Sequence, residues 1–124
     1  MRPATLTLRR SLAVKKKTAG ESSAAYATTL QLLAHALADT GDDEAALTMF
    51  RRVLAIQKAT LGVKHAHYAY TLNGMGSLLV AIGRRADGLQ ALREALATHV
   101  EAGRAEDGAT VMINLATALR EGGD

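Results

Sequence analysis

Apolar side chains recur along this chain at steps of three and four residues, the spacing that gathers them on one face of an α-helix. Within residues 24–39 that face is formed by Leu30, Leu33, Ala34 and Leu37. Gly41, a residue able to take positive φ, follows as a stop signal. The pattern therefore predicts a helix from Ala24 to about Asp39.

A second helix is predicted directly after this stop. Asp42 and Asp43 stand where they can cap its N-terminus and favour it electrostatically. This second helix ends at Gly62. Its apolar positions are Ala46, Phe50, Val53, Leu54 and Leu61. The two helices form one helical hairpin, which cannot bury its apolar faces without a neighbour.

The same arrangement returns at an interval of 42 residues. Leu12, Leu54 and Leu96 keep this step within the similar stretches RRSLAV, RRVLAI and REALAT. The second copy repeats the small and apolar positions as Leu72, Met75, Gly76, Leu79, Gly83, Gly88, Leu92, Ala95 and Leu96. A third copy begins two residues out of step, with Met112, Leu115, Ala116 and Leu119. Such a period indicates a stacked-repeat architecture, in which each copy covers the next. In RRVLAI we expect Leu54 and Ile56 to face the core, after a solvated basic pair.

We therefore predict an all-α fold of about six helices, arranged as antiparallel hairpins in a single domain over residues 1–124. Its parts are a half repeat (1–20), two full repeats (21–62 and 63–104) and a second half repeat (105–124). The composition agrees, because aromatic residues make up only 3% and alanine and leucine, both strong helix formers, supply most of the apolar surface. The one proline, Pro3, interrupts no later helix.

This hairpin, with small residues at fixed sites, resembles the tetratricopeptide repeat. The small residues midway along the first helix of each pair are Ala34, Gly76 and Ala116, and those near the start of the second are Ala46 and Gly88. The 42-residue step and the stretch LGVKHAHYAYTLNGMG are similar to the kinesin-light-chain type of this repeat. The resemblance implies a right-handed superhelical solenoid, whose first helices line a concave groove that holds a peptide or partner segment.

Charge and targeting features narrow the class of protein. The net charge of +3 arises from residues 1–20, which hold six basic and no acidic side chains. The basic residues are not interleaved with aromatic ones, so we expect no nucleic-acid partner. No apolar run approaches the length of a membrane span, and no signal peptide is visible, so we expect a cytoplasmic protein with no membrane partner.

Catalytic and metal-binding patterns are weak in this sequence. The chain has no cysteine, which excludes disulfides, thiolate metal sites and a cysteine nucleophile. His65 and His67 form an H-x-H pair, but we favour a capping or linker role for His65 over a zinc site. The serines lack a nucleophile-elbow frame, and the glycines form no phosphate loop. We expect no enzymatic activity, no cofactor and no metal.

The remaining candidate is a binding surface. By helical phase the groove-facing residues are Thr28, Gln31 and His35, then Tyr70, Asn73 and Ser77, then Thr110, Ile113 or Asn114, and Thr117. The amides in this row can both donate to and accept from an extended peptide backbone. We therefore predict a protein-interaction module. The alternative is a structural segment of a longer solenoid with no site of its own, which the half repeats at both ends favour. Those ends also predict self-association through uncovered apolar stripes.

Overall fold

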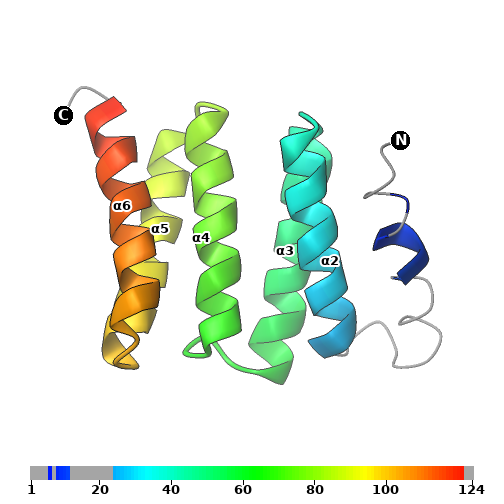
Figure 1. Cartoon of the computed structure of the whole chain (residues 1–124), viewed down its shortest axis with the longest axis horizontal. Coiled ribbons are helices and arrows are strands. Elements are labelled where there is room, and N and C mark those ends of the chain that lie inside the picture. The colour runs from blue at the N-terminus through cyan, green and yellow to red at the C-terminus, as the bar shows by residue number, and fades with distance from the viewer. Residues whose placement is uncertain (1–5, 7, 12–23, 122–124) are drawn as a thin grey trace. The chain divides into compact units, whose positions relative to one another are not determined.

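The computed structural model describes residues 6, 8–11 and 24–121, and within these ranges all regular structure is helical. Figure 1 shows the helices, and their bounds are α2 (Ala24–Asp39), α3 (Asp43–Thr60), α4 (Ala66–Ala81), α5 (Arg85–Glu101) and α6 (Ala105–Glu121). Residues 6 and 8–11 are also helical. The chain divides into two compact units, 1–62 and 63–124. We call α2, α4 and α6 the A helices and α3 and α5 the B helices.

In the first unit, α2 and α3 form the predicted hairpin. The turn between them holds Gly41 at φ 87°, the positive value that the sequence predicted. The Asp42 amide donates to the Leu37 carbonyl at 2.9 Å, which satisfies a carbonyl at the C-terminus of α2. Because the turn is short, the two helices are antiparallel neighbours.

The core of this unit lies between α2 and α3. The predicted stripe of α2 is confirmed, because Leu30, Leu33, Ala34 and Leu37 are all buried. On α3 the burial is shifted from the prediction for RRVLAI. Val53 and Gln57 are buried, whereas Leu54 and Ile56 are only half-buried, and Arg51 and Arg52 are exposed as expected. The predicted apolar positions Ala46, Phe50 and Val53 are therefore buried, and only Leu54 and Ile56 are less buried than expected.

The predicted role of Asp42 is only partly right. Asp42 is the N-cap residue of α3, but its side chain makes no capping hydrogen bond. Its carboxylate instead accepts a hydrogen bond from the Thr40 hydroxyl at 3.2 Å, which draws it back toward the turn. Asp43 and Glu44 occupy the first turn of α3, where their negative charges interact favourably with the helix dipole.

In the second unit, α5 packs against both α4 and α6. The turns that join these helices hold Gly83 (φ 91°) and Gly103 (φ 73°), so the hairpin turn of the first unit is repeated twice. The small residues predicted at the close crossing of α4 and α5, Gly76 and Gly88, are buried. The corresponding residues of the first unit, Ala34 and Ala46, are fully buried as well.

Helix α6 buries a different stripe from the one that the sequence singled out. Gly108, Val111 and Ala118 are buried, and the Cα of Gly108 faces Leu96, His99 and Val100 of α5. Of the predicted stripe, Leu115 and Leu119 are half-buried, whereas Met112 is 56% exposed and Ala116 is exposed. The apolar stripe that the sequence predicted to be uncovered on this helix is therefore exposed only in part, at Met112 and Ala116.

Across the described residues, no helix is both long enough and apolar enough to cross a membrane.

Candidate binding groove

The residues predicted to line the groove all lie on A helices. Thr28, Gln31 and His35 belong to α2 in the first unit, and the other members belong to α4 and α6 in the second unit.

On α2 the three residues differ in their exposure. Thr28 is exposed, as expected for a groove residue. Gln31 is only 7% exposed, so most of its side chain is packed rather than presented to solvent. His35 is half-buried and meets the Phe50 ring edge-on, with the ring centroids 5.1 Å apart. Burial lowers the pKa of His35, and the nearby charge of Asp39 opposes this effect only in part.

On α4 and α6 two predicted residues meet directly. The Asn114 side-chain amide donates to the Asn73 side-chain carbonyl at 2.9 Å, which joins residues 41 positions apart. Asn114, not the alternative Ile113, therefore faces α4, and Ile113 is 66% exposed. This bond ties the two A helices of the second unit together.

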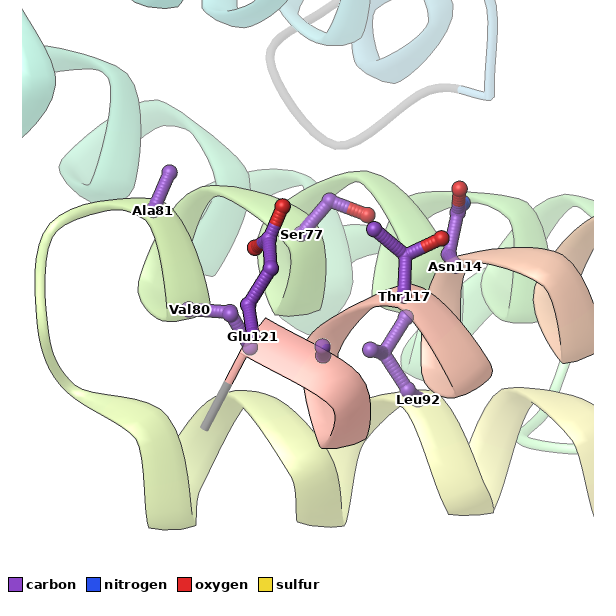
Figure 2. Close-up of a pocket in the computed structure, with 8 residues that line it drawn as sticks. Ser77, Val80, Ala81, Leu92, Asn114, Thr117 and Glu121 are labelled. Atoms are coloured by element: carbon purple, nitrogen blue, oxygen red, sulfur yellow. The ribbon is translucent and has the colours of Figure 1, made fainter. Parts of the chain in front are cut away.

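Beside this pair lies a pocket of about 140 Å³, which we call the α4–α6 pocket (Figure 2). Its walls come from all three helices of the second unit and consist of Ser77, Val80, Ala81, Leu92, Asn114, Thr117, Ala118 and Glu121. Ser77, Asn114 and Thr117 are three of the residues predicted to line the groove. The structure thus brings part of the predicted row to one cavity.

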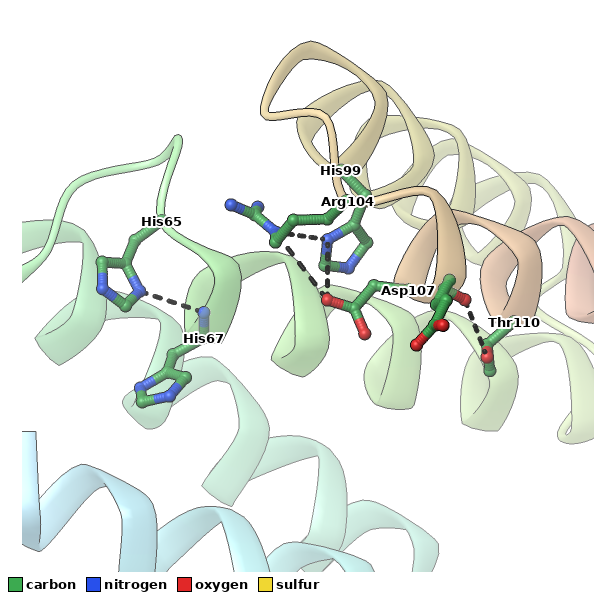
Figure 3. A network of polar contacts seen from close by, with 7 residues as sticks. His65, His67, His99, Arg104, Asp107 and Thr110 are labelled. Atoms are coloured by element: carbon green, nitrogen blue, oxygen red, sulfur yellow. Dashed lines mark hydrogen bonds and ion pairs between the residues drawn. The ribbon is translucent and has the colours of Figure 1, made fainter.

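Two predicted residues of the second unit lie outside this pocket. Tyr70 is 57% exposed on α4, and Thr110 is exposed on α6. The Thr110 hydroxyl donates to the backbone carbonyl of Glu106 at 3.5 Å (Figure 3), a bond within its own helix.

Sequence reasoning missed Glu121, the charged residue of the pocket. Glu121 lies four residues after Thr117 and seven after Asn114, so helical periodicity places all three on one face of α6. Extending the predicted row by one turn would have found it. Leu92 was assigned to the core, and it forms the floor of the pocket while remaining almost fully buried.

A second polar cluster lies at the turn between α5 and α6 (Figure 3). The Arg104 Nε donates to the His99 Nδ1 at 3.2 Å, and Asp107 Oδ2 lies 3.8 Å from the same Arg104 Nε. His99 is only 3% exposed. Burial and then the positive charge of Arg104 lower the pKa of His99, whereas Asp107 raises it. A neutral His99 fits this arrangement, because Nδ1 must accept the bond.

The H-x-H pair has a structural role. His65 is the N-cap of α4, and its Nδ1 accepts a hydrogen bond from the His67 backbone amide at 3.1 Å (Figure 3). The predicted capping role of His65 is therefore confirmed. Within the described ranges, no three His, Cys, Asp or Glu side chains are gathered so that they could hold a metal ion.

Comparison with known proteins agrees with this architecture. The family model described as tetratricopeptide repeat matches residues 7–59 and 27–99, which together span more than half of the chain. The crystal structure of BtubC (BKLC) from P. vanneervenii matches 97% of this chain with a TM-score of 0.88 and 21% sequence identity. This chain spans 49% of that one. No curated protein sequence matched the chain.

The chain belongs to the tetratricopeptide repeat family. Its fold class, an all-α solenoid of helix hairpins, is confirmed by the structural match. Tetratricopeptide repeats are generally protein-interaction modules and are typically not enzymes.

Proposed function

We propose that this protein binds an extended segment of a partner protein along α4 and α6, the A helices of the second unit, and that the α4–α6 pocket is the centre of this site. The observation that carries the proposal is the convergence of Ser77, Asn114 and Thr117 on one cavity, beside the hydrogen-bonded pair Asn73 and Asn114. Hydroxyl and amide groups can hydrogen-bond an extended backbone in either direction. We further propose that the protein is cytoplasmic and that it binds its partner without a cofactor.

Tyr70 supports an extended site rather than an isolated cavity. It is exposed on α4, the helix that also supplies Asn73 and Ser77. An exposed tyrosine offers a large amphipathic contact at a low cost in side-chain entropy. A partner segment that lies along α4 could therefore contact Tyr70 and reach the pocket.

The alternative is a scaffold role, in which this region only stacks against other repeats. The uncovered apolar stripe of α6, with Met112 and Ala116 exposed, favours this alternative. The two functions are not exclusive, because the stripe and the pocket use different residues.

A peptide-display selection tests the proposal. Random peptides would be selected on the whole chain and then titrated into isotope-labelled protein, with the amide resonances followed by NMR. We expect the largest shifts on α4 and α6, and at least a roughly tenfold loss of affinity when Tyr70→Ala and Asn73→Ala are combined. The matched control is Arg93→Ala, at an exposed residue on the B helix α5, which should leave the affinity unchanged. Selected peptides that bind only through α5, or that tolerate the double variant, would contradict the proposed groove.

A further inference from the structure

The α4–α6 pocket has an apolar floor and a polar rim. Val80, Leu92 and Ala118 supply the apolar surface, and they come from three different helices. Ser77, Asn114 and Thr117 add neutral polar groups, as Figure 2 shows. At about 140 Å³ the cavity suits one side chain, since pockets for cofactors and drug-sized ligands begin near 300 Å³.

The hydrogen bond between the two asparagines decides which group Asn114 can offer a ligand. Its side-chain nitrogen already donates to Asn73 at 2.9 Å. The Asn114 carbonyl oxygen is not part of that bond, and a carbonyl oxygen can only accept. Asn114 therefore adds an acceptor to the wall of the pocket.

Ser77 adds a group that needs a partner. Its hydroxyl oxygen is buried and has no hydrogen-bond partner among the described residues. A buried hydroxyl without a partner costs free energy, so a ligand that donates to it gains an interaction which the free protein lacks. The Thr117 hydroxyl lines the same wall and can accept in the same way.

Glu121 gives the pocket its charge. It is the one ionisable residue among those that line the cavity, and no ion pair joins it to another described residue. A carboxylate beside three neutral acceptors favours a ligand that carries positive charge and several hydrogens to donate.

We propose that the α4–α6 pocket binds a lysine or arginine side chain of the partner segment. The methylene stem would lie against Val80 and Leu92, and the charged head would reach Glu121 and the neutral acceptors. Basic side chains suit such a cavity because they bury an apolar stem while they keep the charged end hydrogen-bonded. This inference rests on the proposed function and names the chemistry of its partner.

The test uses two short peptides that differ only in the charged head: acetyl-Ala-Ala-Lys-Ala-Ala-amide and the same peptide with norleucine in place of lysine. Each is titrated into the isotope-labelled whole chain. We expect saturable shifts at the amides of Ser77, Asn114 and Thr117 with the lysine peptide, and clearly weaker binding of the norleucine peptide. Equal affinities for the two peptides would overturn the proposal, as would shifts centred elsewhere or no shifts up to the solubility limit.

Two variants separate a specific contact from a general effect of charge. Glu121→Gln should lower the affinity for the lysine peptide by about 2- to 5-fold, the range for an exposed ion pair. It should leave the affinity for the norleucine peptide unchanged. Glu101→Gln removes the same charge from an exposed position outside the pocket and should change neither affinity. An equal effect of both variants would show that the lysine peptide responds to net charge only, and would overturn the proposal.

The peptide-display selection distinguishes failure of this inference from failure of the proposed function. Selected peptides that bind across α4 and α6 without a basic residue would refute the inference and leave the proposed groove intact. Selected peptides that bind elsewhere would refute both. Enrichment of one lysine or arginine position, with affinity lost in Glu121→Gln, would support both.

Discussion

The carbonyl oxygen of Gly76 lies against the Cα of Gly88, so close that a Cβ on Gly88 would stand only 2.7 Å from it. The relationship is reciprocal, because a Cβ on Gly76 would stand 3.0 Å from the Gly88 carbonyl oxygen. The backbones of α4 and α5 are therefore in near contact at this crossing. Val80 closes the space further, since its backbone nitrogen would be 2.8 Å from the same Gly88 Cβ.

Gly88→Ala should destabilise the protein, because the added methyl meets backbone atoms that a rotamer change cannot move away. We expect a loss of about 1–3 kcal/mol in the free energy of unfolding. Urea denaturation followed by circular dichroism measures it. Helix propensity predicts the opposite sign, since alanine is favoured over glycine in a helix interior by about 1 kcal/mol. The sign of the change therefore decides between the two effects.

Gly108→Ala is the matched control for this prediction. A Cβ on Gly108 would meet Leu96, His99 and Val100 at 3.7–4.0 Å, which is ordinary van der Waals contact. We expect this variant to be more stable than the parent by about 0.5–1 kcal/mol, because helix propensity acts there without a clash. A stabilising Gly88→Ala, or a destabilising Gly108→Ala, would contradict the crossing geometry.

Substitutions of Gly83 test the effect of a positive φ in the absence of a steric clash. Its φ of 91° is unfavourable for any residue with a Cβ, although no neighbouring atom lies within 4 Å of that position. Gly83→Ala should cost about 1–2 kcal/mol of unfolding free energy. Gly83→Asn should cost less, because asparagine tolerates positive φ better than other residues do. Equal midpoints of thermal unfolding for these two variants would be inconsistent with a strained turn.

Stability should fall as the pH decreases through the titration range of His99. Burial and Arg104 lower the pKa of folded His99 from its ordinary value of 6.5. Between that value and the lowered one, the unfolded chain binds more protons than the folded chain, so acid favours unfolding. The stabilisation is fully present above pH 6.5 and is lost through this window.

Urea midpoints measured from pH 8 to pH 5 would show the effect, and NMR titration of the imidazole resonances would assign it. His35 should contribute in the same direction, since burial lowers its pKa too. His99→Gln should therefore reduce the pH dependence without removing it. A His99 resonance that titrates above 6.5 would show that Asp107 outweighs burial and Arg104.

The uncovered face of α6 should cause concentration-dependent self-association. Met112 and Ile113 are large apolar residues that are more than half exposed. Changing both to lysine should lower the average mass measured by light scattering at high concentration, because it removes apolar area that association would bury. Leu32→Lys, at a residue that is 52% exposed on α2, is the control and should have a smaller effect. A parent chain that stays monomeric at every concentration would contradict this prediction.

The helical hairpins and their turns follow from local patterns in the amino-acid sequence. A period of 42 residues, with Gly41 and Gly83 one step apart, fixes where helices end, because positive φ is a local property of the backbone. The stripe of Leu30, Leu33 and Leu37 follows from helical periodicity in the same way. The membership of the tetratricopeptide repeat family could also be recognised from these positions.

Which polar groups meet depends on how the helices pack against one another. Helical phase placed Asn73, Ser77, Asn114 and Thr117 on the A helices, but it did not predict the bond between the asparagines or the pocket with Glu121. Contacts between residues 41 positions apart depend on the rotation and separation of two helices, and these are set by the packing of all their side chains. Periodicity fixes the face of a residue only to within part of a turn, which is also why Leu54, predicted together with Val53, is only half-buried.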